Sequence, residues 1–344
     1  MKKKDSVGAT IKDVARETGL AISTISKYMN GGTVREKNRK KIEEAVRRLN
    51  YVPNSSARGL RTKRTYRVGV ITGVVNSPHT SAVISEVERK LREKGYTMLF
   101  FSYDGSLKKT EQYIEYMIET GMDGMLVTIP GNRAGSLVLP GSGTIPVVTM
   151  EENCGIVEGD CVQTNCIMGA YEIVEHLIKK GHTDIALVKG REFSMTAEER
   201  IRGYLRVMED YGIPVKPEYV VRGDYTYQGG YRAVARLWNL KNRPTAVFVT
   251  NYDMSMGAME AVRDLGIRIP EELSVVVFDD FELSVMVRPK LTSVRQPLTE
   301  LADAACELLI QRMNGDYSNY PRRIRLKPQC IYRDSVRDLI GTGA

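Results

Sequence analysis

The sequence lacks any long uninterrupted apolar segment. No run of 18 apolar residues occurs among its 344 residues, so a membrane-spanning helix is not expected. The first five residues, Met1-Lys2-Lys3-Lys4-Asp5, are mostly charged, and a secretory signal peptide would need an apolar stretch there. We therefore expect the protein to stay in the cytoplasm.

Cysteine is scarce and has no metal-binding spacing. The five cysteines are odd in number and form no CxxC pair: Cys154, Cys161, Cys166, Cys306 and Cys330. This pattern favours buried reduced thiols over a disulfide framework or a zinc site. No metal and no cofactor is expected.

The common signatures of catalysis are also missing. The sequence contains no Walker loop, no HExxH and no GxSxG, and Gly141-Ser142-Gly143-Thr144 lacks the final glycine of a dinucleotide fingerprint. An enzyme is therefore not expected.

Positive charge, in contrast, is concentrated at one end of the chain. Residues 1–67 carry 18 Lys and Arg against 6 Asp and Glu, whereas the remaining 277 residues carry 32 against 36. A basic segment beside a mildly acidic body fits binding to phosphate backbones through counterion release. The alternative is that these charges are ordinary solvated helix faces.

Three short amphipathic helices are predicted in this basic segment. The first begins at Thr10, with Asp13 as a first-turn acid, and ends at Gly19. After a four-residue link, a second helix over 24–29 has its apolar residues on one face. A third helix has Ile42, Val46 and Leu49 at helical spacing, completing a small core around a helix-turn-helix.

These helices resemble the start of the lactose-repressor (LacI/GalR) family of bacterial transcription regulators. The resemblance lies in Thr10–Ala15, Ser23–Lys27, Asn30-Gly31, Tyr51–Asn54 and the hinge residues Asn54–Leu60. In that family the second helix reads the major groove, and a hinge helix places a leucine from each subunit in the minor groove. The resemblance assigns that role to Leu60, although a leucine here could also pack on the body.

The resemblance therefore implies a set of DNA-binding residues. They are Thr10, Ile22, Ser23, Thr24, Ser26, Lys27, Asn30, Thr33, Asn54, Ala57, Arg58 and Leu60. Short polar side chains and Lys27 suit contacts to base edges or phosphate, and an apolar wedge can kink a duplex. Ile22 suits contact with a thymine methyl group, but its spacing to Ile25 also permits a core position.

Two positions depart from the family pattern. Ala21 and Arg35 stand where relatives usually have serines that cap the second and third helices. Each loss costs about 0.5 to 2 kcal/mol. Ser23 or Thr33 is the expected substitute.

From Val68 onward, apolar strands alternate with helices, which predicts parallel, doubly wound sheets. We predict an α/β fold. It has a three-helix helix-turn-helix domain over 8–53, a hinge over 54–66, and an effector-binding and dimerisation domain over 67–338. The last resembles periplasmic binding proteins, with two parallel-sheet subdomains closing over a ligand in a cleft.

Open parallel sheets bind ligands at the carboxyl ends of their strands. The candidate ligand-binding residues are His79, Thr80, Glu151, Arg200, Tyr225, Asn251 and Asp279. Arg200 and Asp279 are assigned by the family resemblance, and the others follow from their positions after apolar runs. An Arg, an amide, carboxylates and an aromatic ring suit a sugar or sugar derivative.

Simpler explanations exist for several of these residues. Arg200 and Asp279 could form an interdomain ion pair, and His79 and Glu151 could be ordinary surface residues. The matching His182 is expected to be structural, as a connector from helix to strand.

The expected partners are double-stranded operator DNA, a small-molecule effector and a second copy of the chain. A helix stripe of Leu298, Leu301, Ala305, Leu308 and Leu309 serves either the core or the dimer interface. A phosphorylated carrier protein is the alternative regulator, because 223–227 and 286–289 resemble the catabolite control branch of the family.

Overall fold

The computed structural model describes residues 9–29, 32–51, 64–73, 75, 77–103, 106–129, 145–152 and 159–340. The chain divides into two compact units, Met1–Thr65 and Tyr66–Ala344. The division falls at the end of the 54–66 segment predicted as a hinge. The hinge itself lies mostly outside the described residues, so the predicted domain boundaries stay a prediction.

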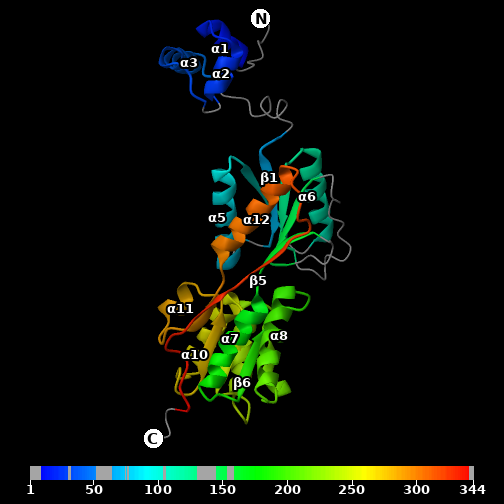
Figure 1. The fold of residues 1–344 in the computed structure, drawn as a ribbon. Coiled ribbons are helices and arrows are strands. Elements are labelled where there is room, and N and C mark those ends of the chain that lie inside the picture. The colour runs from blue at the N-terminus through cyan, green and yellow to red at the C-terminus, as the bar shows by residue number, and fades with distance from the viewer. Residues whose placement is uncertain are drawn as a thin grey trace, which may run out of the picture. The chain divides into compact units, whose positions relative to one another are not determined.

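The described residues of the first unit form three helices, α1 (Ile11–Thr18), α2 (Ile22–Met29) and α3 (Glu36–Arg48) (Figure 1). The Asp13 carboxylate accepts hydrogen bonds from both the backbone N–H and the hydroxyl of Thr10, at 2.9 and 2.7 Å. Gly19 ends α1 in the left-handed conformation, which glycine adopts without steric cost. Both predicted boundaries of α1 are confirmed.

The capping predictions for the other two helices are wrong. Helix α2 begins at Ile22, so Ser23 lies inside it rather than capping it. Arg35 occupies the N-cap position of α3 and its side chain makes no capping hydrogen bond, so Thr33 does not substitute there. The core of the unit is small, with Val14, Ile25, Ile42 and Ala45 buried at its centre.

The second unit contains two six-stranded sheets. The first sheet has the strand order β11-β5-β4-β3-β1-β2 and is parallel throughout. Its strands are β1 (Arg67–Thr72), β2 (Thr97–Ser102), β3 (Gly124–Val127), β4 (Val147–Met150), β5 (Asp160–Thr164) and β11 (Arg323–Leu326). One face is covered by α5 (Pro78–Glu93) and α12 (Leu298–Met313), and the other by α6 (Leu107–Glu119).

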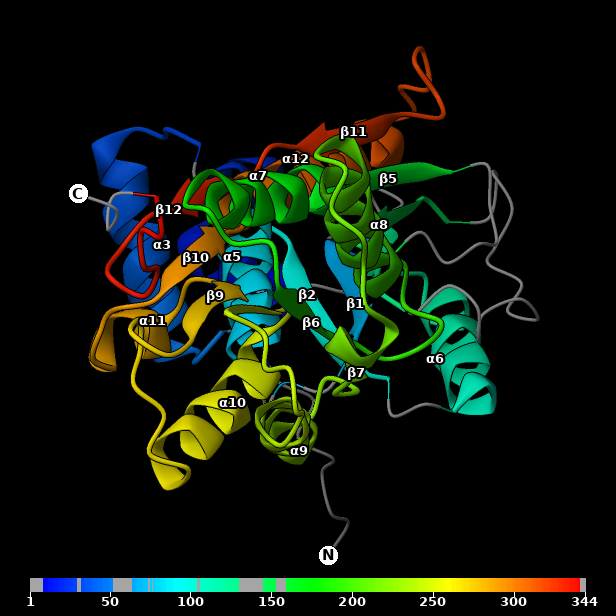
Figure 2. The same cartoon turned by 90° about the horizontal axis from the view of Figure 1, so that it is seen from below.

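The second sheet has the order β12-β10-β9-β8-β6-β7, and only β12 runs antiparallel. Its strands are β6 (Ile185–Lys189), β7 (Val220–Arg222), β8 (Ala246–Val249), β9 (Ser274–Phe278), β10 (Thr292–Arg295) and β12 (Gln329–Ile331). Helices α7 (Cys166–Lys179) and α8 (Met195–Asp210) cover one face, as Figure 2 shows. Helices α9 (Tyr227–Trp238) and α10 (Tyr252–Asp264) cover the other. Two short helices, η1 (Pro217–Tyr219) and α11 (Glu282–Met286), complete the unit.

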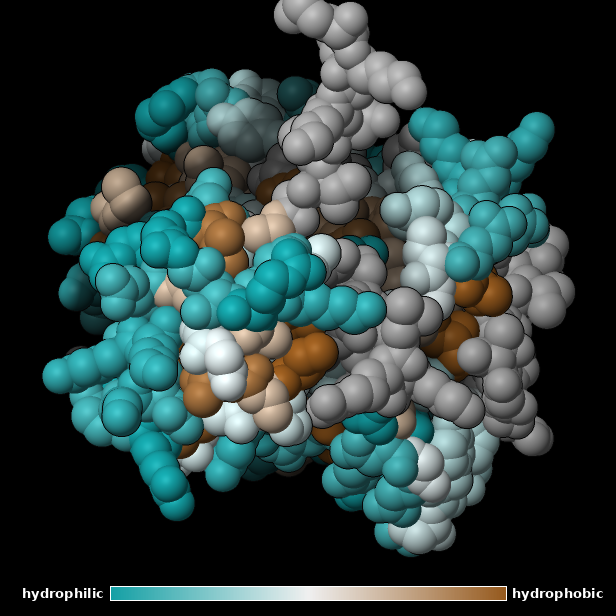
Figure 3. All heavy atoms as spheres, turned by 90° about the horizontal axis from the view of Figure 1, so that it is seen from above, coloured by the Kyte–Doolittle hydropathy of each residue, from teal (hydrophilic) through white to brown (hydrophobic). Residues whose placement is uncertain are grey.

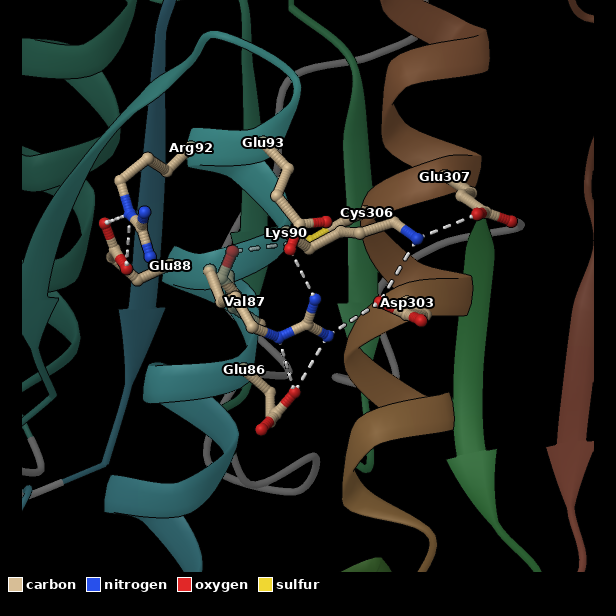
Figure 4. Close-up of polar contacts among 10 residues, drawn as sticks. Glu86, Val87, Glu88, Lys90, Arg92, Glu93, Asp303, Cys306 and Glu307 are labelled. Carbon is tan, nitrogen blue, oxygen red and sulfur yellow. Dashed lines mark hydrogen bonds and ion pairs between the residues drawn. The ribbon is translucent and has the colours of Figure 1, made fainter.

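The apolar stripe of α12 belongs to the core of its own subunit. Leu301, Ala305, Leu308 and Leu309 are buried against the first sheet, and Leu298 packs partly buried beside them. The opposite side of α12 meets α5 through charged side chains (Figure 4). Lys90 of α5 lies 3.2 Å from Asp303 and 3.0 Å from Glu307 of α12. The dimer role considered for this stripe is therefore wrong.

Buried polar groups elsewhere in the unit are well paired. His182 contacts Thr245 at 2.9 Å, the Ser274 hydroxyl at 3.0 Å and the Arg337 carbonyl at 3.1 Å, which confirms its structural role. Cys161, Cys166, Cys306 and Cys330 are free thiols. Burial raises the pKa of Cys166 to about 12, so this thiol is unreactive.

Two further findings concern the described residues as a whole. None of their helices combines the length and apolar character needed to cross a membrane. Within the same residues, no three His, Cys, Asp or Glu side chains gather in a way that could hold a metal ion. The face drawn in Figure 3 is mainly hydrophilic, with apolar side chains in small patches between polar ones.

Candidate functional site

Helix α2 presents a polar and partly apolar surface to solvent. Ile25 is fully buried, whereas Ile22 is 44 % exposed. Ser23 and Lys27 are also exposed, and Thr24 and Ser26 are partly buried. The core position considered for Ile22 is therefore wrong, and its side chain is free to contact a base edge.

Helix α3 is tied to α2 by a side-chain hydrogen bond. The Tyr28 hydroxyl donates to Glu43 at 2.5 Å, and Arg39 donates to Glu43 and to Glu36 at 2.9 and 2.7 Å. The Tyr28 bond joins α2 to α3, and the Arg39 bonds lie within α3, where one of them holds Glu43. Lys37, Lys40, Lys41 and Arg47 stay exposed, which keeps the surface of this unit positive.

Five predicted DNA-binding residues lie outside the described residues. They are Asn30, Asn54, Ala57, Arg58 and Leu60. Thr10 and Thr33 are described and exposed.

In the second unit, backbone strain gathers at the carboxyl ends of the strands. Five non-glycine residues with positive φ follow strands there: Glu151, Phe193, Asp224, Tyr225 and Asp279. Such conformations cost about 1 to 3 kcal/mol each and tend to occur at functional sites. The predicted ligand residues Glu151, Tyr225 and Asp279 are all among them.

Arg200 and Asp279 do not form the ion pair considered from the sequence. Arg200 is buried in α8, donates to the Thr250 carbonyl, and has its guanidinium 3.9 Å from the centre of the Phe278 ring. Asp279 accepts from Gln296 Nε2 at 2.6 Å and from the Tyr252 N–H at 3.2 Å. The two charges are close enough to interact without direct contact.

His79 and Glu151 are partners rather than surface residues. His79 lies in the first turn of α5, where Pro78 takes the first helical position after Ser77. Its Nε2 lies 2.9 Å from Glu151 Oε1, and both side chains are mostly buried. Burial lowers the pKa of His79, but the negative charges of Glu151 and Asp279 outweigh burial and raise that pKa above its ordinary value.

Tyr225 lies flat over the end of β6. A Cβ on Gly190 would come within 2.2 Å of the Tyr225 ring, so glycine is required there for the ring to occupy its position. The Tyr225 hydroxyl is buried. Asn251 is less available than predicted, since its side-chain oxygen caps α10 by accepting from the Met254 N–H at 3.0 Å.

Sequence reasoning missed Glu152, which joins the two halves of the unit. Glu152 follows β4 of the first sheet, and its carboxylate accepts from Ser194, Met195 N–H and Thr196 at the start of α8, at 2.7 to 2.9 Å. A carboxylate at a helix N-terminus is stabilised by the helix dipole. The sequence signal for this residue is the acidic pair Glu151-Glu152 directly after an apolar strand. The hydrogen-bond partners of Glu152 lie some 40 residues further along the chain, so they could not be predicted from it.

We call His79, Glu151, Glu152, Arg200, Tyr225 and Asp279 the strand-end cluster. Contacts bring its members together: His79 lies 2.9 Å from Glu151, Glu152 accepts from Ser194 at the start of α8, and Arg200 of the same helix donates to the Thr250 carbonyl. A pocket of about 460 Å³ adjoins the cluster and shares Asp279 with it. Gln296, the partner of Asp279, also lines this pocket and was not predicted.

Several cluster atoms have unused hydrogen-bonding capacity. Among the described residues, Arg200 Nε and Tyr225 OH are buried without a hydrogen bond, and Tyr103 OH and Thr164 Oγ1 share this property. Buried polar groups are normally satisfied, because leaving one unpaired costs about 1 to 3 kcal/mol. Two such atoms in one cluster indicate a site that a polar ligand completes.

Comparison with known proteins agrees with this architecture. Residues 10–54 match the model of bacterial regulatory proteins of the lacI family, and residues 174–336 match a periplasmic binding protein-like domain. The chain is 34 % identical to the HTH-type transcriptional repressor PurR of Proteus mirabilis, covering 96 % of this chain and 97 % of that one. It is 30 % identical to the ribose operon repressor of Haemophilus influenzae, covering 96 % and 99 %.

Solved structures show the same fold. A lac repressor dimer bound to operator and an anti-inducer superposes with a TM-score of 0.83 at 24 % identity, covering 96 % of this chain and 99 % of that one. The transcriptional regulator CelR in complex with cellobiose superposes with a TM-score of 0.73 at 26 % identity, covering 95 % and 99 %. The chain belongs to the lacI family of bacterial regulatory proteins. It is a DNA-binding transcriptional regulator rather than an enzyme.

Proposed function

We propose that this protein is a homodimeric repressor whose affinity for a specific operator is changed by a sugar or sugar derivative bound at the strand-end cluster. The observation that carries the proposal is the two buried polar groups without a partner, Arg200 Nε and the Tyr225 hydroxyl, beside the carboxylates of Glu151 and Asp279. A polyol would complete them, because each hydroxyl can donate to a carboxylate and accept from an N–H or O–H. Its apolar ring face would lie against Tyr225.

Relatives support a small-molecule effector. One has a name that refers to a ribose operon, and one solved neighbour contains cellobiose. Operator DNA, as the target, also makes the cytoplasm the proposed location.

Operator reading is assigned to the exposed side of α2. Ile22 would contact a thymine methyl group, while Ser23 and Lys27 would reach base edges or phosphates. The hinge roles of Asn54, Ala57, Arg58 and Leu60 rest on the sequence resemblance alone.

Effector binding is proposed to act through the bridge between the subdomains. Glu152 ties the end of β4 to the start of α8, and Arg325 of β11 pairs with Glu199 of α8 at 2.6 Å. A ligand that contacts Glu151 on one side and Arg200 on the other would change how strongly these halves are held together. A coupling of about 1 to 3 kcal/mol between effector and operator is typical.

Thermal-shift screening with a panel of sugars tests the effector site, since a ligand that binds the folded state raises the melting temperature. The sugar that stabilises the protein should lose its effect in the Asp279→Ala variant and keep it in Glu209→Gln. Glu209 is an exposed residue on the same helix as Arg200, so it is a matched control. An unchanged response in Asp279→Ala would remove Asp279 from the site.

Operator binding is tested through the hinge. Leu60→Ala should weaken binding to the operator far more than binding to unrelated DNA, because only the specific complex bends the duplex. An equal loss of affinity for the operator and for unrelated DNA would refute the insertion of Leu60 into the minor groove. The logarithm of affinity should also fall linearly with the logarithm of salt concentration, at about 0.9 per phosphate neutralised.

Control by a phosphorylated carrier protein is the second candidate. The segment that suggested it contains Met286, which is 75 % exposed beside an exposed Val285. Such a patch suits either a partner protein or the second subunit of the dimer. Operator affinity that changes with a phosphorylated but not with an unphosphorylated carrier protein would favour this candidate.

A further inference from the structure

The cations of the strand-end cluster are surrounded by carboxylates. His79 Nε2 lies 2.9 Å from Glu151 Oε1. Arg200 is within electrostatic reach of Asp279, and its own hydrogen bond goes to the Thr250 carbonyl. With Glu152, three carboxylates stand against two cations in this cluster.

In the adjoining pocket, too, the basic side chains are paired with acidic ones. Its two basic residues are Arg295, which pairs with Asp280 at 2.6 Å, and Lys327, which lies 3.5 Å from Glu172. Asp279 and Glu300 add negative charge to its lining. The pocket therefore brings no unmatched positive charge to the cluster.

The groups left for a ligand are one N–H of the Arg200 guanidinium, the neutral Tyr225 hydroxyl and two carboxylates. Arg200 Nε and the Tyr225 hydroxyl are unpaired, and the carboxylates of Glu151 and Asp279 keep unused lone pairs. Hydroxyl groups satisfy both kinds of atom, since they donate to the carboxylates and accept from Arg200. A phosphate or carboxylate group has only acceptors at neutral pH and would place its charge beside Glu151 and Asp279.

We propose that the strand-end cluster selects an uncharged polyol and excludes sugar phosphates and sugar acids. The proposal rests on the effector function proposed above and makes it narrower. Glu151 and Asp279 are the residues that exclude anions, one from each sheet. His79 keeps Glu151 from being an unpaired buried charge while leaving one of its oxygens for a ligand hydroxyl.

Protonation around the cluster agrees with a negative local potential. The pKa of His79 is raised by Glu151 and Asp279 even though burial alone would lower it. The pKa of Asp253 is raised by burial and by the charge of Asp279. A potential that holds protons on these groups also disfavours an incoming anion.

Arg191 is a positive group beside the cluster that remains open to solvent. Its guanidinium lies 5.8 Å from the centre of the Tyr225 ring, and the residue is exposed. Water screens an exposed charge of this kind, so Arg191 does not offset two buried carboxylates.

The test uses the full-length protein and sets of compounds that share one sugar skeleton. One set is glucose, glucosamine, glucuronate and glucose 6-phosphate, and a second is ribose and ribose 5-phosphate. Affinities are measured by isothermal titration calorimetry at fixed ionic strength. In the set whose skeleton binds, the anionic members should bind about a hundredfold more weakly than the neutral one, because like charges in contact cost several kcal/mol.

The variant Glu151→Gln keeps the shape of the side chain and removes its charge. It should reduce the ratio of affinities between the neutral and the anionic compounds by about tenfold. Glu209→Gln should leave this affinity ratio unchanged. An anionic compound that binds as tightly as its neutral parent would overturn this proposal, and so would an affinity ratio that Glu151→Gln does not change. Either result would leave the effector function in place. If no compound of any charge binds, the effector function fails, and this proposal fails with it.

Discussion

The buried ion pair between Asp160 and Arg312 provides the sharpest test of how α12 is held to the first sheet. Arg312 Nε and Nη2 lie 2.7 and 3.2 Å from the two Asp160 oxygens, and both side chains are almost completely buried. Asp160 also accepts from the Arg322 N–H at 2.7 Å. The change Asp160→Ala would leave the Arg312 guanidinium buried without its counter-charge.

Breaking one side of a buried pair costs about 3 to 5 kcal/mol. In a domain of this size each kcal/mol lowers the melting temperature by about 2 to 4 °C. We therefore expect Asp160→Ala to melt about 6 to 20 °C below the unaltered protein. Replacing both partners, as Asp160→Ala with Arg312→Met, removes the uncompensated charge and should restore most of this loss.

Urea unfolding followed by circular dichroism measures the change, with Asp303→Ala as the control. Asp303 lies on the same helix but pairs at the surface, where an ion pair contributes at most about 1 kcal/mol. A loss below about 1 kcal/mol in Asp160→Ala, or a double variant as unstable as the single one, would refute the reasoning.

Three further outcomes are expected. Ile22→Ala should reduce discrimination between the operator and a single-base variant by about 1 kcal/mol or more in a gel-shift assay, and an unchanged ratio would exclude base contact. Burial raises the pKa of Asp280, but hydrogen bonds from Arg333 and two other residues lower it to about 2. Because this folded-state pKa lies below the unfolded value of 3.8, Asp280 should contribute about 2 kcal/mol above pH 4 and lose this contribution as pH falls towards 2. In urea titrations, the difference between Asp280→Asn and the unaltered protein should shrink over that range, and a constant difference would contradict it. Glu152→Gln should destabilise the protein by about 1 to 3 kcal/mol, because the three hydrogen bonds use both carboxylate oxygens and the amide keeps only one oxygen that can accept, and an unaltered urea midpoint would contradict that.

Local chemistry allowed much of the fold to be predicted from the sequence. Thr10 with Asp13 and Gly19 set the two ends of α1 through hydrogen bonds within a few residues, and the helix begins and ends where these residues predict. Parallel strands buried on both faces read as continuous apolar runs, as in Ser274–Phe278. The residues after these runs, such as Asp279, then follow from the geometry of parallel sheets.

What could not be predicted depends on contacts between distant segments. Amphipathicity shows that α12 has an apolar side but not which surface that side covers, and the structure places it on the first sheet although it follows a strand of the second. The partners of Glu152 are set by how the two halves meet, which no local period encodes. The sequence also left open whether Ile22 lies in the core or on the surface, because its three-residue spacing to Ile25 is compatible with either face of a short helix.

The chain passes between the two sheets of the second unit three times, and each connection is very short. Asn165 alone separates β5 from α7, Gln296 and Pro297 separate β10 from α12, and Lys327 and Pro328 separate β11 from β12. Three tethers of this length let the lobes pivot but prevent them from drifting apart or sliding. A signal sent through this unit is therefore a change in the angle between the two lobes. Gln296 lies in one of the connections and donates a hydrogen bond to Asp279, so it links this angle to the strand-end cluster.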